Sequence, residues 1–349
     1  MGRLSLFSAR LARLANLATF AVLICALALL PPSANAQLSP PPCQGQDILA
    51  DLKQSEPGAY EKIMARASTT PNGGALFWKI EKPGLPTSWL FGTIHMTDER
   101  VHALPDSVRN AIATAQTIVL EATSLSPESV GQAMAGLGPQ LLFTDGRTLD
   151  QFLTKEEYAI AKSILAKNGF SGPIGQRLKP WLLTVFLSLP ECELRRAAAG
   201  LKSLDASIEA TAKQRGANLV GLETAEEQLR AMAGLPLDAQ LAWLKTSIRL
   251  RDRAEDSLET MIQLYLGRRI GAVWALTRQL AGSGPETETA INGFQQALIT
   301  YRNERMRDRA LPILEHGSAF IAVGALHLPG EVGLVQLFRD AGYRVTAAE

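Results

Sequence analysis

Two histidines near opposite ends of the chain lie in the same short pattern. The stretch FGTIHMTDE places His95 three residues after a glycine and four before Glu99, and VGALHLPGE places His327 and Glu331 in the same way. Each pattern, G-x-x-H-x-x-x-E, follows an apolar run that predicts a buried strand. Two imidazoles with one or two carboxylates suit either a divalent transition metal with an open position for water or a metal-free acid/base pair.

Two further carboxylates come at the ends of short predicted strands. Glu121 ends TIVLEAT, which is rich in β-branched residues, and Glu223 ends ANLVGLET. In open parallel sheets, ligands bind in a crevice at the carboxyl ends of the strands. We therefore expect His95, Glu121, Glu223 and His327 to lie around one crevice. A glycine before each histidine would allow a sharp turn and a close approach of a ligand to the backbone.

Each of these residues also has an ordinary structural interpretation. A single histidine near a strand end is more often a satisfied polar residue than a ligand, and a glutamate at a helix start is favoured by the helix dipole. The repetition of the pattern favours a site. Of the four histidines, His102 and His316 lack the pattern and are expected at the surface. Arg302 could donate to a substrate oxygen or could be one of several solvated arginines in RNERMRDR.

Strand and helix signals repeat at the two ends of the chain. ALFWKIEK and SWLFGTI predict two strands in a hairpin-like arrangement, followed by a helix in LPDSVRNAIATAQ that Asp106 could cap. Near the C-terminus, AFIAVGALH predicts a strand, residues 331–341 a helix and YRVTA a strand. Strand, helix, strand units of this kind favour parallel crossovers. We expect both units to share one sheet.

The region between the two units, about residues 125–310, is mainly helical in its patterning. One helix is expected to begin with the capping box Thr154 to Glu157. The predicted fold class is therefore α/β, with a mixed sheet built from two strand-GxxH-helix-strand units and a large central helical insertion. A single domain would span residues 37–349.

The first 36 residues have the features of a secretory signal peptide. A leader with three arginines precedes an apolar core at residues 17–30, and Ala34-Asn35-Ala36 is a small-x-small cleavage site. A membrane anchor is the weaker alternative, because the apolar run is shorter than the roughly 20 residues that span a bilayer. We expect cleavage after Ala36, no stable membrane anchor afterwards, and a periplasmic or secreted protein.

The mature chain would be nearly neutral and would keep two cysteines. Subtracting the three leader arginines leaves 32 basic residues against 34 acidic ones. This balance argues against nucleic-acid binding, which requires a strongly basic face. Cys43 and Cys192 remain, and an even pair in an oxidising compartment favours a disulfide over two separate thiols.

These motifs together resemble the TraB/GumN family, which is related to the Tiki metalloproteases. The matching segments are FGTIH, IVLEAT, YRN and VGALHLPGEVGLVQLFRDAGYRV. The central VGLETAEEQL, the upstream Asp205 and the cysteine pair at Cys43 and LPECEL are similar to the bacterial GumN-type branch. The resemblance covers essentially the whole mature chain.

The resemblance implies an exported hydrolase, a metal-dependent peptidase acting on a peptide or protein substrate. It places His95, His327 and Glu121 at a divalent metal, manganese, cobalt or zinc, with Arg302 stabilising an oxyanion. A second carboxylate, Glu223 or Glu331, would take the proton.

Two alternatives remain open. One is a metal-independent, esterase-like hydrolase that uses the histidines and glutamate directly. The other is a non-catalytic periplasmic protein that binds metal or haem or acts as a scaffold.

Overall fold

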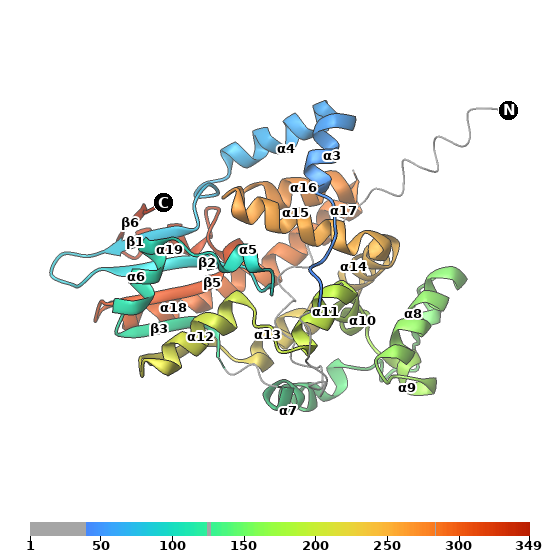
Figure 1. Ribbon diagram of the computed structural model, residues 1–349. Coiled ribbons are helices and arrows are strands. Elements are labelled where there is room, and N and C mark those ends of the chain that lie inside the picture. Colours follow the sequence, from blue (N-terminus) through green and yellow to red (C-terminus); the bar gives the residue numbers. More distant parts are fainter. Residues whose placement is uncertain (1–39, 124–126, 283) are drawn as a thin grey trace.

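A six-stranded mixed sheet forms the centre of the protein (Figure 1). The computed structural model describes residues 40–123, 127–282 and 284–349, so the expected signal peptide lies outside the described residues. The strand order is β4-β3-β5-β2-β1-β6. The strands are β1 Phe77–Glu81, β2 Ser88–Thr93, β3 Thr117–Ala122, β4 Asn218–Glu223, β5 Ala319–Gly324 and β6 Arg344–Ala347.

The sheet combines a parallel centre with an antiparallel edge. Strand β5 pairs in parallel with both β2 and β3, and β3 pairs in parallel with β4. Strand β1 is antiparallel to β2 and to β6, so the hairpin expected from the sequence is confirmed. The two terminal units share one sheet, and the C-terminal strand β5 is inserted between the two strands of the N-terminal unit. The predicted α/β class is thereby confirmed.

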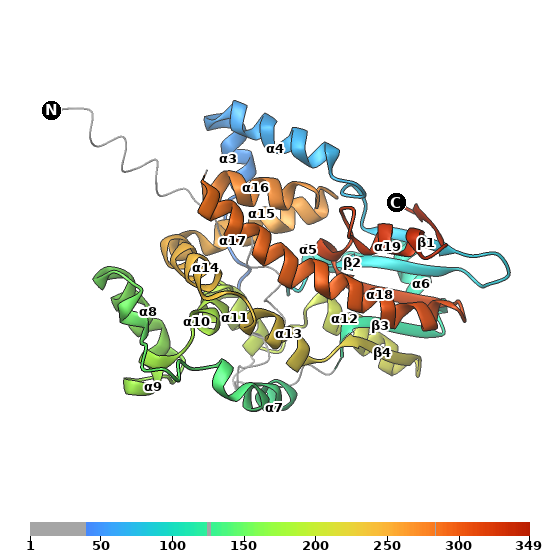
Figure 2. The same cartoon turned by 180° about the vertical axis from the view of Figure 1, so that it is seen from behind.

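Alternating side chains make both faces of the sheet apolar. In β5, Phe320 and Ala322 face one core cluster, whereas Ile321 and Val323 face the other. Helices α6 and α12 contribute to the first cluster, and α18 and α19 to the second, on the opposite face (Figures 1 and 2). These four helices are α6 Asp106–Thr114, α12 Leu204–Gln214, α18 Tyr301–Leu314 and α19 Leu334–Asp340.

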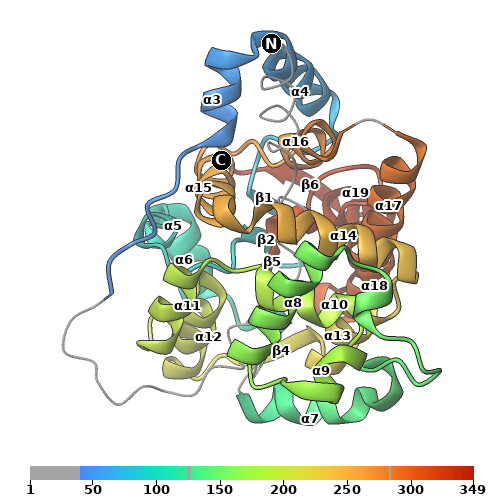
Figure 3. The same ribbon diagram turned by 90° about the vertical axis from the view of Figure 1, so that its right-hand side faces the viewer.

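A large helical region lies beside the sheet (Figure 3). The capping box at Thr154 is present at the start of α8, as predicted. Strand β4 interrupts this region and joins the sheet at its edge. The remaining helices are α3 Ile48–Ser55, α4 Pro57–Thr69, α5 Glu99–His102, α7 Pro127–Leu137, α8 Lys155–Lys167, α9 Gly172–Arg177, α10 Pro180–Leu187, α11 Glu191–Ala198, α13 Ala225–Ala233, α14 Leu237–Leu250, α15 Ala254–Leu266, α16 Ala272–Ala281 and α17 Pro285–Gln295.

Short helical turns complete the chain. The 3-10 turns are η2 Gly138–Gln140, η3 Leu149–Gln151, η4 Arg251–Arg253 and η6 Ala325–His327. The segment η5, Gln296–Thr300, is a π-helix that leads directly into α18. Such wide turns are rare in proteins, and those that do occur are frequently at functional sites.

A disulfide joins the N-terminal segment to the middle of the chain. Cys43 and Cys192 are bonded, with their Cα atoms 5.4 Å apart, as the sequence predicted. Cys192 lies in α11, so the bridge fixes the start of the described chain against this helix. Over the described ranges, no helix is both long and apolar enough to cross a bilayer.

Four local predictions differ from the structure. The strand expected through His327 ends at Gly324, and the helix expected from 331 begins at Leu334, because the Pro329-Gly330 turn intervenes. Asp106 lies in the first turn of α6 without capping it. His102 is half-buried instead of lying at the surface, because its Nε2 lies 3.3 Å from the carbonyl oxygen of Met96.

Candidate active site

Three polar side chains converge at the carboxyl edge of the parallel strands. His95 follows β2, Glu121 lies near the end of β3, and His327 ends the 3-10 turn after β5. The Nε2 atom of His95 lies 3.7 Å from Oε2 of Glu121, and the Nε2 atom of His327 lies 3.8 Å from the same oxygen. All three side chains are buried. Two ring nitrogens from opposite ends of the chain therefore face one carboxylate oxygen.

Asp205 holds His95 by its other ring nitrogen. Oδ2 of Asp205 lies 2.6 Å from Nδ1 of His95, and Oδ1 accepts a 2.6 Å hydrogen bond from the hydroxyl of Thr93. Burial alone would lower the pKa of His95, but the carboxylates of Asp205 and Glu121 outweigh it and raise this pKa to about 10. His95 is therefore an imidazolium at neutral pH in this arrangement.

Asn303 holds His327 in the corresponding way, but without a charge. The Nδ2 group of Asn303 donates to the carbonyl oxygens of Val332 and His327, so its Oδ1 faces Nδ1 of His327 at 2.6 Å. Nδ1 must then be the protonated nitrogen, which leaves a lone pair on Nε2. Burial lowers the pKa of His327 to about 4. The two histidines of the repeated motif thus have opposite protonation states.

Glu121 is an ionised carboxylate held on both oxygens. Oε2 accepts a 2.8 Å hydrogen bond from the backbone N–H of Gly324, and Oε1 accepts one of 3.1 Å from the amide of Gln228. Arg302 also donates to Oε1. Burial would raise the pKa of Glu121, but the Arg302 guanidinium and the His95 imidazolium beside it hold this pKa well below its ordinary value.

Arg302 links Glu121 to a second buried glutamate. Its Nε and Nη2 donate to Oε2 of Glu223 at 2.9 and 2.6 Å, and its Nη1 donates to the carbonyl oxygen of Leu298 at 3.2 Å. Arg305 also pairs with Glu223. The Arg302 side chain is only 2% exposed, and its donors are committed to these acceptors. Arg302 and Glu223 therefore form a support that fixes the position of Glu121.

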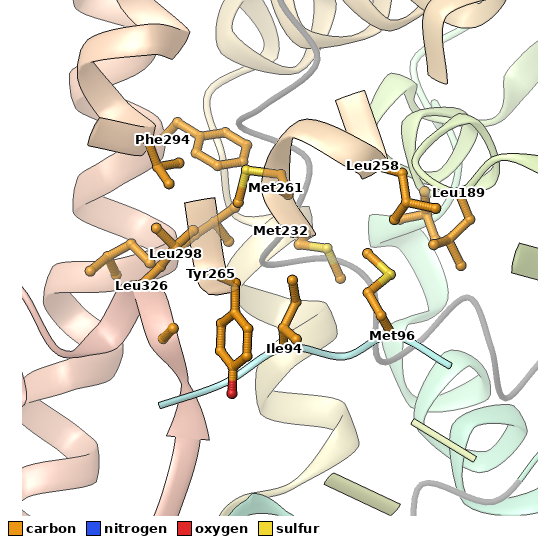
Figure 4. Packing of buried hydrophobic residues seen from close by; sticks show 14 of the residues in the cluster. Ile94, Met96, Leu189, Met232, Leu258, Met261, Tyr265, Phe294, Leu298 and Leu326 are labelled. Carbon is orange, nitrogen blue, oxygen red and sulfur yellow. The ribbon is translucent and has the colours of Figure 1, made fainter. Parts of the chain in front are cut away.

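A small, mostly apolar pocket opens beside the histidines. His95, Glu121 and His327 line it together with side chains that include Tyr265 and Leu326. Figure 4 shows these two residues among the packed side chains around Ile94, Met261 and Leu298. The cavity volume is about 30 Å³, which is enough for water but not for a peptide.

The residues proposed from sequence occupy three different places. His95, Glu121 and His327 meet in the pocket, whereas Glu223 and Arg302 lie outside its lining and support Glu121. Glu331 is exposed and is not part of the lining. Glu99 begins α5 and is exposed, like an ordinary charge at a helix start.

Three further residues contribute to the site without having been predicted from the sequence. Gln228, which donates to Glu121, lies within VGLETAEEQL, but a glutamine on a helix carries no signal for this contact. Asn303, which holds His327, lies next to Arg302 in the YRN motif. Tyr265 lines the pocket and donates from its hydroxyl to the carbonyl oxygen of Gly92 at 2.9 Å. No local signal in the sequence indicates that tyrosine.

His95, His327 and Glu121 are side chains of the types that bind a divalent transition metal, but the distances between their ligand atoms are longer than a bound metal requires. Each histidine presents Nε2 toward Glu121 while a side-chain oxygen holds Nδ1, an arrangement typical of metal-binding imidazoles. Ligand atoms around a tetrahedral metal are about 3.4 Å apart, given bonds of about 2.1 Å. Within the ranges that the structure covers, no three histidine, cysteine or acidic side chains form a ready metal-binding group. The three side chains would have to move closer together to bind a metal.

The amino-acid sequence of the chain matches that of a known protein family over most of its length. Residues 76–347 match the TraB/PrgY/gumN family, and this range contains every residue of the site. The chain belongs to the TraB/PrgY/gumN family. The resemblance found in the sequence motifs is thereby confirmed. No solved structure matches the chain significantly.

The relatives of this TraB/PrgY/gumN chain are distant. Metalloprotease TIKI2 of Danio rerio is 24% identical over 318 residues, covering 78% of this chain and 60% of the relative. Metalloprotease TIKI1 of Xenopus tropicalis is 22% identical over 342 residues, covering 85% of this chain and 65% of the relative. The chain thus spans less than two thirds of these metalloproteases. The uncharacterized protein YbaP of Escherichia coli strain K12 is 24% identical over 269 residues, covering 74% of this chain and 90% of YbaP.

Proposed function

We propose that this TraB/PrgY/gumN protein is an exported metal-dependent peptidase. The observation that supports this most directly is the convergence of the His95 and His327 Nε2 atoms on Oε2 of Glu121, with each Nδ1 held by a side-chain oxygen. Two distant relatives bear the name metalloprotease. The features of residues 1–36 and the Cys43–Cys192 disulfide support export.

The protein's own residues would divide the work as follows. His95, His327 and Glu121 would hold the metal, which would supply Lewis-acid chemistry and activate water near neutral pH. Asp205 and Asn303 fix the two imidazole rings. Arg302 holds Glu121, so we assign it this positioning role in place of the oxyanion role expected from the sequence.

The apolar lining would exclude bulk water from the reacting groups. Tyr265, Met261 and Leu326 contribute to it. Low polarity around the site strengthens electrostatic interactions with the scissile group.

The opposite protonation states of the two histidines favour a second candidate, a metal-independent hydrolase. His327 Nε2 has a lone pair that could take a proton from an attacking water, and the His95 imidazolium could protonate the leaving group. Glu121 would stabilise the imidazolium. A pKa of about 4 makes His327 a weak base, so this candidate ranks second.

Metal analysis of purified mature protein tests the first candidate. We expect about one manganese, cobalt or zinc ion per chain in the wild type, and none in His95→Ala or His327→Ala, because each removes one of only two neutral-nitrogen ligands. His316→Ala is the matched control, since His316 is exposed and outside the pocket. Cleavage of a peptide library with added manganese or cobalt should follow the metal content.

Each other outcome selects among the candidates. Cleavage that a strong chelator leaves unchanged, with loss in both histidine variants, would select the metal-independent hydrolase. Stoichiometric metal in the double variant His95→Ala/His327→Ala would contradict the proposal that these histidines bind the metal. Metal binding without any cleavage would leave a binding protein.

A further inference from the structure

A second, larger pocket adjoins the candidate active site. Its cavity volume is about 380 Å³, within the range typical of ligand pockets. Ile299 and Leu326 line both this pocket and the small pocket of the histidines. Leu326 immediately precedes His327 in the chain. The side chains of Ile299 and Leu326 therefore lie between the larger pocket, called the groove below, and the small pocket of the histidines, which cannot hold a peptide.

Four separate segments form the walls of this groove. They are the end of α4, helix α16, the end of α17 with the π-helix η5, and the segment from η6 to α19. Figure 2 shows α4, α16 and α18 on the same side of the molecule as α19. A backbone hydrogen bond of 2.7 Å from Gly330 to Pro71 ties the turn to the segment after α4. The groove is thus a built feature of the fold, next to the rare π-helical turn.

The lining combines apolar surface with a cation that is free to bind a ligand. Trp274 is half-buried and packs edge-on against Phe294, and Val332 is 42% exposed. Arg278 is already bonded to Glu288 and to side-chain oxygens on α17. The guanidinium of Arg66 is exposed and has no hydrogen-bond or ion-pair partner in the part of the chain that the structure describes. An unpaired guanidinium beside an aromatic wall is suited to a carboxylate next to an apolar side chain.

We propose that this groove, lined by Arg66, Trp274, Ile299, Leu326 and Val332, binds a carboxylate-bearing apolar segment of the peptide substrate. The inference rests on the proposed peptidase, because the ligand assigned to the groove is the substrate of that enzyme. The groove adjoins the pocket of the histidines through Ile299 and Leu326. Arg66 binds the carboxylate, and Trp274 and Val332 contact the neighbouring apolar side chain. The carboxylate is either a free C-terminus or an acidic side chain.

Calorimetric titration with three short acetylated peptides tests this groove. All three contain leucine, alanine and phenylalanine; one ends in a free carboxylate, one in an amide, and one in an amide with an internal aspartate. Chelator is present, and each peptide is recovered and verified as intact. We expect one or both carboxylate peptides to bind wild-type protein about tenfold more tightly than the neutral peptide. Arg66→Gln should abolish this difference.

A matched charge control separates local from general electrostatics. Lys162→Gln removes one exposed positive charge from α8, away from the groove, and should keep the tenfold preference. Equal affinity of wild-type protein for all three peptides, or no binding of any, would overturn the proposal. So would an equal loss for all three peptides in Arg66→Gln. Arg66-dependent binding in chelator, together with no cleavage of the peptide library when chelator is omitted and manganese or cobalt is added, would instead refute the peptidase and leave the groove in place.

Discussion

At the scale of single residues, the two copies of one motif have become chemically different. His95 faces the carboxylate of Asp205, whereas His327 faces the neutral amide of Asn303. The pKa of the first is raised to about 10, and that of the second is lowered to about 4. The G-x-x-H pattern identifies both histidines but contains neither partner. Local sequence could therefore indicate the site, but it could not indicate the charge at each ring.

This difference predicts how metal binding depends on pH. A metal must displace the proton of His95, while His327 is already neutral above about pH 4. We expect the apparent metal affinity to rise about tenfold per pH unit from about pH 6 to about pH 8, with about one proton released per ion. Titration calorimetry in buffers of different ionisation enthalpy measures that number.

The variant Asp205→Asn provides the contrasting case. Removing the carboxylate that raises the pKa of His95 should flatten the pH dependence. A wild-type affinity that does not change over this pH range would contradict the assignment of the proton to His95.

At the scale of elements, the strands were predictable and the reason for their glycines was not. Alternating or continuous apolar runs predicted β1 to β6 because each strand must bury one or both faces. A sharp turn was expected at Gly92 and Gly324, yet neither has a positive φ. A Cβ at Gly324 would lie 3.1 Å from Oε2 of Glu121 and 3.2 Å from Nε2 of His95. Position 324 therefore requires glycine chiefly because a larger residue would crowd the side chains of Glu121 and His95.

Alanine at the two glycines should therefore have different effects. Gly324→Ala pushes directly on Glu121 and His95, so we expect metal affinity and activity to fall about tenfold or more while the free energy of unfolding changes by under about 1 kcal/mol. At Gly92, a Cβ would lie 2.6 Å from Leu328 Cδ1 and 3.1 Å from the Cα of Ala325. Gly92→Ala should instead destabilise the fold by about 1 to 3 kcal/mol through overpacking.

Denaturant unfolding and metal titration of both glycine variants make the comparison. The informative result is the ranking: the Gly324 variant should be the worse one in binding, and the Gly92 variant the worse one in stability. The reverse order would show that the site does not depend on the space at Gly324.

At the scale of the whole molecule, the disulfide links two regions that the sheet does not connect. Cys192 lies in α11, where the neighbouring Glu193 accepts a 2.6 Å hydrogen bond from the backbone of Thr97. Thr97 is two residues after His95. The bridge was predictable from cysteine count and the expected compartment, but its position behind the His95 loop required the fold.

Removing the disulfide should lower stability substantially. The bridge spans 149 residues, and loop-closure entropy in the unfolded chain gives a loss of about 5 kcal/mol in the free energy of unfolding for Cys43→Ser/Cys192→Ser. Denaturant titrations of this variant and of the wild type, with and without reductant, measure it. Reductant should destabilise only the wild type; an equal effect on both proteins would mean that the bridge is not responsible.

The position of β5 also sets an order of events in the making of the protein. This strand separates β2 from β3, although it is encoded after both of them and after the helical region. A chain that is still being synthesised holds those two strands without the one that joins them, and it lacks His327. Hydrogen-bonded neighbours lie about 4.8 Å apart, so β2 and β3 cannot close the gap without changing partners. The candidate site therefore forms only after β5 and His327 have been made, and a chain that has not reached them lacks both the central pairing of its sheet and one of its two histidines.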